Sequence, residues 1–97
     1  MFIQVIEFTS GKHDEIRALV ESYRDAAGGK STARRGLLTR DRDNEGSYVN
    51  IVFFDSYDDA MQNSDLPETG AFAEKMMALC DGPPTFHNLE VVVDQEM

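Results

Sequence analysis

Apolar residues recur along the chain with two spacings, which predict strands and helices in alternation. Residues 2–8 and 47–55 are rich in β-branched and aromatic side chains, which is typical of strands buried within a sheet. Residues 12–27 carry an apolar stripe with helical spacing, formed by Ile16, Leu19, Val20, Tyr23 and Ala27. Gly28 and Gly29 follow this stripe and predict that the helix stops there.

The remaining segments predict a hairpin, a broken helix and a last strand. A strand over 34–42 and the turn cluster 43–46 precede the strand 47–55, so the two strands are expected to pair as a hairpin. Helical pieces are expected over 57–63 and 68–79, interrupted near Pro67, and a strand over 85–93.

This order, β-α-β-β-α-β, predicts an α+β, ferredoxin-like fold. The expected sheet has four antiparallel strands, with the helices on one face. No long linker, repeat or low-complexity segment interrupts the pattern, so residues 1–97 are interpreted as a single domain.

The strand 47–55 presents apolar side chains on both faces. We expect Val49, Ile51 and Phe53 to pack under the helices. The opposite, open face would then carry Tyr48, Asn50, Val52 and Phe54. A face this apolar is not left in water. The sequence therefore predicts a homodimer, a dimeric α/β barrel in which two sheets face each other and a cavity remains for a small apolar or aromatic ligand.

The distribution of charge along the chain argues against some classes of binding partner. The net charge of −9 lies wholly in residues 55–97, whereas residues 1–54 hold eight acidic and eight basic side chains. A nucleic-acid partner is not expected, because the only basic group, Lys30, Arg34, Arg35, Arg40 and Arg42, fits the charged edge of a sheet. The single cysteine and the lack of a long apolar run or basic leader indicate a cytoplasmic protein without an internal disulfide or a membrane segment.

Few residues suggest chemistry. Asn50 is a polar amide between apolar strand residues, and either binds a ligand or satisfies a neighbouring backbone group. Tyr48 shares its face and either hydrogen-bonds a ligand or places its hydroxyl at the rim. His87, in the last strand, is either a substrate contact or a structural histidine. The two histidines and one cysteine show no metal-ligand spacing, so no metal site is expected.

Beyond these patterns, the chain resembles the antibiotic biosynthesis monooxygenase family of the dimeric α/β barrel group. The similarity in layout covers nearly the whole chain, and its local anchor is the run Val-Asn-Ile-Val-Phe-Phe-Asp-Ser over 49–56, with Gly-Pro-Pro-Thr-Phe over 82–86. Members of that family oxidise polycyclic phenols to quinones with molecular oxygen, without metal or flavin. The resemblance therefore implies a monooxygenase that needs no cofactor.

The resemblance also implies roles for particular residues. Asn50 matches a family asparagine and would be the catalytic residue, holding a substrate carbonyl or phenolate. Phe54 stands where the family has tryptophan, and Ala60 where it has tyrosine. The expected substrate-binding residues are Tyr48, Val52, Phe54 and His87. Two alternatives stay open: a binding module that does not convert its ligand, and an accessory subunit that acts through its acidic half.

Overall fold

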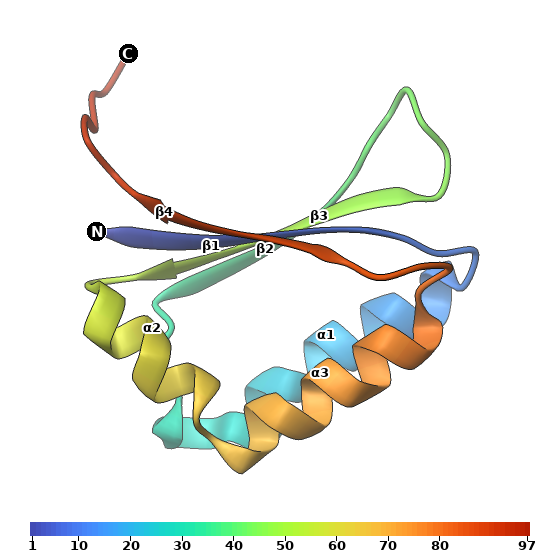
Figure 1. The fold of residues 1–97 in the computed structure, drawn as a ribbon, viewed down its shortest axis with the longest axis horizontal. Helices are drawn as coiled ribbons and strands as arrows, with labels where there is room; N and C mark the ends of the chain where they lie inside the picture. The colour runs from blue at the N-terminus through green and yellow to red at the C-terminus, as the bar shows by residue number, and fades with distance from the viewer.

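The computed structural model describes all 97 residues and confirms the predicted order of elements. The elements are β1 (Phe2–Thr9), α1 (His13–Ala27), the short 3₁₀ helix η1 (Gly28–Lys30), β2 (Arg35–Arg40), β3 (Ser47–Phe54), α2 (Tyr57–Ser64), α3 (Pro67–Leu79) and β4 (Thr85–Glu90). All three α-helices lie on one side of the sheet (Figure 1). The α+β, ferredoxin-like fold predicted from the sequence is therefore confirmed.

Local sequence signals set the helix ends. Gly28 ends α1 with a φ of 55°, a left-handed conformation that favours glycine. Ser56 caps α2, because its hydroxyl accepts a hydrogen bond from the Asp59 N–H at 3.1 Å. Pro67 is the first residue of α3, where the missing N–H is not needed. These signals explain why the helical segment breaks into α2 and α3 at the predicted place.

The four strands form one antiparallel sheet in the order β2-β3-β1-β4. β2 is thus the charged edge strand that the sequence predicts. Of the predicted basic group, only Arg35 and Arg40 lie in β2 itself, whereas Arg34, just before it, pairs with Asp55, and Lys30, in η1, pairs with Glu68. β4, the other edge, ends at Glu90 rather than at residue 93. Its pairing with β1 ends at Phe2 and Glu90, and the Met1 carbonyl accepts a further hydrogen bond from the Val91 N–H at 3.0 Å.

The predicted assignment of the two faces of β3 is wrong. Tyr48, Asn50 and Phe54 are buried under the helices, at 4%, 6% and 1% exposure. Val52 lies on the same side, packed against the cluster that contains Phe54. The reason lies in the helices: α1 and α3 supply Ile16 and Met76, which pack on Tyr48, and α2 supplies Ala60, which packs on Phe54.

The sheet face away from the helices is therefore the odd-numbered one. Cross-strand pairing places seven apolar side chains on it: Ile3, Val5, Leu37, Val49, Ile51, Phe53 and Leu89. Six of them are partly exposed and Leu89 is 47% exposed, because no element of the chain covers this face. We refer to these seven residues as the open face.

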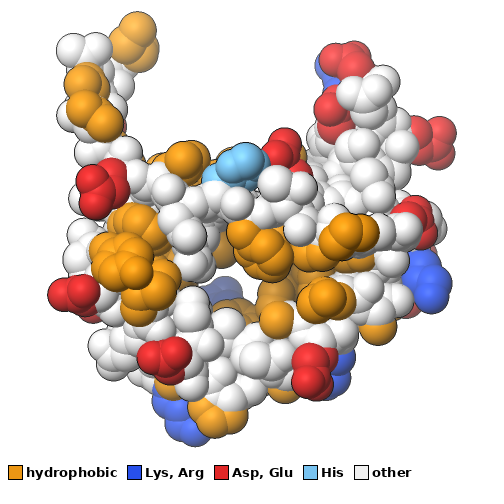
Figure 2. Space-filling view, in the orientation of Figure 1, with side chains coloured by type: hydrophobic (Ala, Val, Ile, Leu, Met, Phe, Trp, Pro, Cys, Tyr) orange, Lys and Arg blue, Asp and Glu red, His pale blue; other side chains and the backbone are white.

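The buried core is divided into two clusters at opposite ends of the sheet. One holds Phe8, Ile16, Tyr48 and Met76, and the other Phe2, Phe54 and Ala60. α1 lies closest to α3, and among the α-helices the backbone of α2 comes nearest to β1 and β3. The space-filling view shows an opening between the sheet and the helices at the middle of the molecule (Figure 2). We call this space the central hollow. No helix is long and apolar enough to cross a membrane.

Candidate functional site

Asn50 lies on the helix side of the sheet, between the two core clusters. Its cross-strand neighbours are Ile6 on β1 and Leu38 on β2. The residue is only 6% exposed, yet its side chain makes no hydrogen bond to the protein. The one fully enclosed side-chain oxygen without a partner belongs to Glu68, so the Asn50 amide keeps access to open space. A buried amide left unpaired by the protein is available to a ligand.

Two more amides share this side of the sheet. Gln4 and Asn88 are paired across β1 and β4, and the Gln4 amide N–H donates to the Asn88 side-chain oxygen at 3.3 Å. Gln4 lies diagonally across from Asn50, because its own partner on β3 is Val52. The helix side of the sheet thus carries amide groups on three adjacent strands, β3, β1 and β4.

The other predicted site residues separate in the structure. Tyr48 stacks on Phe8 with 5.3 Å between ring centroids, and its hydroxyl reaches His13. Phe54 is packed within the second core cluster and leaves almost no ring surface for a ligand. Val52 stands between Asn50 and Phe54 on the same side of β3. Asn50, Tyr48, Val52 and Phe54 therefore share one side, as predicted, but the Tyr48 and Phe54 rings belong to the two core clusters.

His87 lies on the opposite side of the sheet. Its partner on β1 is Val5, and its Nε2 contacts Glu7 Oε2 at 2.7 Å. The pair is about half exposed, with His87 at 43% and Glu7 at 54%. The structure does not bring His87 together with Asn50.

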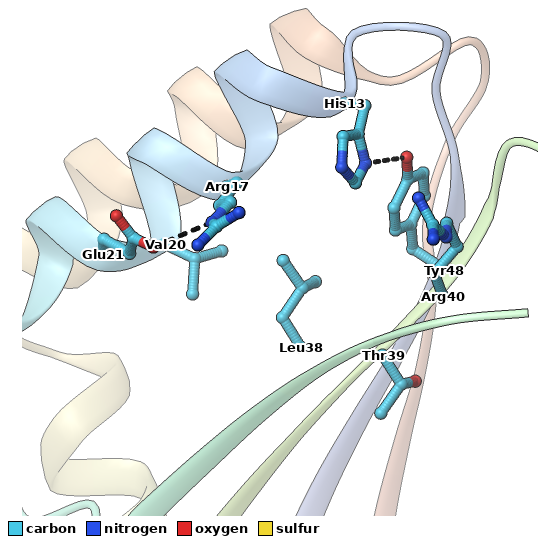
Figure 3. A pocket seen from close by; sticks show the side chains of 8 residues that line it. All are labelled: His13, Arg17, Val20, Glu21, Leu38, Thr39, Arg40 and Tyr48. Atoms are coloured by element: carbon cyan, nitrogen blue, oxygen red, sulfur yellow. Dashed lines mark hydrogen bonds and ion pairs between the residues drawn. The ribbon is translucent and has the colours of Figure 1, made fainter.

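A pocket of about 430 Å³ opens between α1 and the β2–β3 hairpin. It is lined by His13, Arg17, Val20, Glu21, Leu38, Thr39, Arg40 and Tyr48. Figure 3 shows the His13, Arg17 and Val20 side chains reaching from α1 toward the hairpin, and the Leu38 side chain rising toward α1, whereas Thr39 points to the other side of the sheet. Leu38 is the cross-strand neighbour of Asn50, so this pocket borders the residue predicted to be catalytic.

Polar groups gather at one end of this pocket. His13 Nδ1 and the Tyr48 hydroxyl are 2.8 Å apart, and Arg17 pairs with Glu21 at 3.1 Å on the helix surface. Arg40 takes part in none of the four salt bridges of the chain. The structure brings no group of three or more histidine, cysteine or acidic side chains together as a metal site.

Sequence reasoning missed His13, Arg17 and Arg40 as pocket residues. Two signals in the sequence point to them. His13, Val20 and Glu21 each lie three or four residues from Arg17, a helical spacing that places them beside it on the helix surface. Arg40 is directly opposite Tyr48 in the hairpin register, and directly opposite residues point to the same side.

Comparisons with known proteins identify the fold. No protein-family model matches the sequence, and no curated protein matches it significantly. Among solved structures, SnoaB from Streptomyces nogalater, described as a cofactor-independent oxygenase, has a TM-score of 0.83 at 20% identity, covering 96% of this chain and 94% of that one. An antibiotic biosynthesis monooxygenase has a TM-score of 0.77 at 12% identity, over 96% of this chain and 100% of that one.

Rv0793 from Mycobacterium tuberculosis is similar over 99% of this chain and 100% of its own, with a TM-score of 0.76 at 16% identity. At these identities the likeness concerns the fold. The resemblance to antibiotic biosynthesis monooxygenases that the sequence predicts is thus confirmed at the level of the backbone arrangement, across almost the entire chain.

Proposed function

We propose that the protein is a cofactor-independent monooxygenase of the antibiotic biosynthesis monooxygenase type, which oxidises a small aromatic or polyketide-like substrate. The observation that carries this proposal is the Asn50 amide, which is buried on the helix side of the sheet and unpaired by the protein. The shared fold with an oxygenase that needs no cofactor supports it.

In the proposed oxidation, the substrate itself supplies the electrons that reduce oxygen, so the protein has to bind and orient the substrate and stabilise its negative charge. A phenol that has lost its proton is electron-rich and can itself reduce molecular oxygen. One oxygen atom enters the ring and the other leaves as water, and the ring loses two hydrogen atoms as it becomes a quinone. In this proposal the Asn50 amide N–H donates to the substrate oxygen on which negative charge develops, in a site with little water. Ile6 and Leu38, the apolar cross-strand neighbours of Asn50, then contact the ring.

We also propose that the working form is a homodimer that buries the open face. Seven apolar side chains on one uncovered sheet form a larger patch than a monomer normally leaves in water. The central hollow lies on the other side of the sheet, so pairing leaves the Asn50 site accessible.

A second candidate function is a carrier that binds the same ligand without converting it. The observation that favours it is the environment of Asn50, whose cross-strand neighbours Ile6 and Leu38 carry no acid or base. The Tyr48–His13 pair is the nearest such group along β3, two residues away.

The experiment measures oxygen uptake with a panel of bicyclic and tricyclic phenols, and identifies the products by mass spectrometry. Asn50→Ala is expected to lower kcat by about 100-fold or more, the effect of losing one donor to a developing oxyanion. Gln62→Ala, an exposed amide on α2, is the control. Recovery of tightly bound phenols unchanged after long incubation in air would instead support the carrier.

A further inference from the structure

The pocket between α1 and the β2–β3 hairpin is unusual for the charge it carries. The chain as a whole has a net charge of −9. The pocket lining nevertheless contains two arginines, Arg17 and Arg40, against a single acid, Glu21. A local excess of positive charge on an acidic protein marks a place where an anion is attracted rather than repelled.

Arg40 is the arginine of this pocket that forms no salt bridge within the protein. The neighbouring basic residues Lys30 and Arg34 each hold a carboxylate, Glu68 and Asp55, at 2.8 and 2.5 Å. Arg40 forms no such pair and lines the pocket. An arginine fork without a protein carboxylate fits a ligand carboxylate, with which it makes two parallel hydrogen bonds.

The Tyr48 hydroxyl stands on the same side of the hairpin as Arg40, because the two residues are paired across β2 and β3. In its hydrogen bond with His13 Nδ1, either the Tyr48 hydroxyl or the Nδ1–H can be the donor. When Nδ1 carries the proton and donates to the Tyr48 oxygen, the phenolic hydrogen is free to donate to a ligand. Because neutral histidine has two tautomers, this change needs no net uptake of a proton.

The other wall of the pocket is apolar. Val20 on α1 faces Leu38 on β2, as Figure 3 shows, and both line the pocket. The distance from Arg40 to Leu38 along β2 is two strand residues, or about 7 Å. That spacing matches a carboxylate at Arg40 with an attached ring against Leu38, next to Asn50.

We propose that this pocket recognises an aromatic carboxylic acid, with the carboxylate at Arg40 and Tyr48 and the ring between Val20 and Leu38. The inference rests on the proposed function in one respect, since it names the substrate class of the site next to Asn50. Arg17 adds positive charge at the rim, where its pair with Glu21 is largely exposed, at 70% and 66%.

The experiment compares 2-naphthoate with its neutral methyl ester, by calorimetry and by NMR titration of the intact protein. Wild type is expected to prefer the acid. Arg40→Gln keeps a polar side chain but removes the charge, and should raise the Kd for 2-naphthoate about tenfold, the loss of one charge-assisted pair. The matched control is Arg42→Gln, which removes the same charge two residues away, outside the pocket lining.

Three results would overturn the inference. Wild type could bind acid and ester equally, or fail to bind the acid saturably, or lose as much affinity in Arg42→Gln as in Arg40→Gln. The first two need no variant. Oxygen uptake tests the proposed function separately: selective acid binding by a wild type that consumes no oxygen would leave the anion site standing and remove the oxygenase, and uptake unchanged in Asn50→Ala would remove only the catalytic role of Asn50.

Discussion

The His13 imidazole and the Tyr48 hydroxyl are joined by a hydrogen bond of 2.8 Å between the first residue of α1 and the helix side of β3. Their rings lie nearly parallel, with 6.0 Å between centroids. Tyr48 in turn stacks on Phe8 within the first core cluster. The His13–Tyr48 hydrogen bond therefore links the first residue of α1 to the sheet at the edge of the pocket between α1 and the β2–β3 hairpin.

Removing this hydrogen bond should destabilise the fold modestly. Tyr48→Phe keeps the stacked ring, and we expect the free energy of unfolding to fall by about 1 kcal/mol, the usual net value of one such bond. Urea denaturation followed by circular dichroism measures it. Tyr57→Phe, at a residue that is 53% exposed, is the control. An equal loss in both variants would mean that the His13 contact adds nothing.

The homodimer is tested at the centre of the open face. Ile51→Glu places a charge on β3 where a partner sheet would cover it, and an unpaired charge buried there is costly. Analytical ultracentrifugation should show a dimer for wild type and a monomer for Ile51→Glu. Met77→Glu introduces the same charge on α3, at a residue that is 58% exposed, and should leave the dimer intact. A wild-type monomer would contradict the proposal.

The Lys30–Glu68 pair predicts a pH dependence of stability. The hydrogen bond from Lys30, 2.8 Å long, lowers the pKa of Glu68, and the positive charge acts in the same direction. A carboxyl whose pKa is lowered by folding stabilises the protein above its ordinary pKa, and this stabilisation is lost as the pH falls through the lowered value.

Lys30→Met should therefore lower the free energy of unfolding at neutral pH, because it leaves the Glu68 carboxylate without its partner. The difference from wild type should shrink as the pH falls below about 4.3, the ordinary glutamate pKa. Urea midpoints measured across this range show it, with Lys75→Met as the control, since Lys75 forms no salt bridge. A difference that stays constant in acid would contradict the ionic explanation.

The thiol of Cys80 should react slowly. Partial burial raises its pKa, and the neighbouring Asp81 adds to the effect. The thiol also donates to the Met76 carbonyl at 3.1 Å. Because the thiolate is the reactive form, alkylation by iodoacetamide at about pH 8 should be slower than for a free cysteine, whose pKa is about 8.5. The same protein in urea is the control, and equal rates would contradict the expected protection.

The elements and their order could be predicted from the sequence, because each depends on local signals. The helical stripe of α1, the cap at Ser56 and Pro67 at the start of α3 act within a few residues. The last strand was predicted too long because its end depends on β1, whose first residue is far away in sequence.

The faces of the sheet could not be assigned from β3 alone. Both faces of this strand are apolar, and Asn50 makes the buried face look like the more accessible one. Which face of β3 is buried depends on the side of the sheet that Ile16, Ala60 and Met76 cover. That side is set by tertiary contacts between the helices and the sheet. The pocket was missed for the same reason, since it joins α1 to a hairpin about 20 residues further along the chain.

The division of the core into two clusters has a consequence for how a ligand would be detected. Phe8 and Tyr48 pack at one end of the sheet, Phe2 and Phe54 at the other, and the central hollow lies between them. A molecule that fills the hollow binds the folded state alone, and at 100 times its Kd it adds about 2.7 kcal/mol to stability. A rise in the melting temperature of this small protein therefore reports that a compound occupies the central hollow. Compounds can be ranked by the size of this rise before any reaction is known.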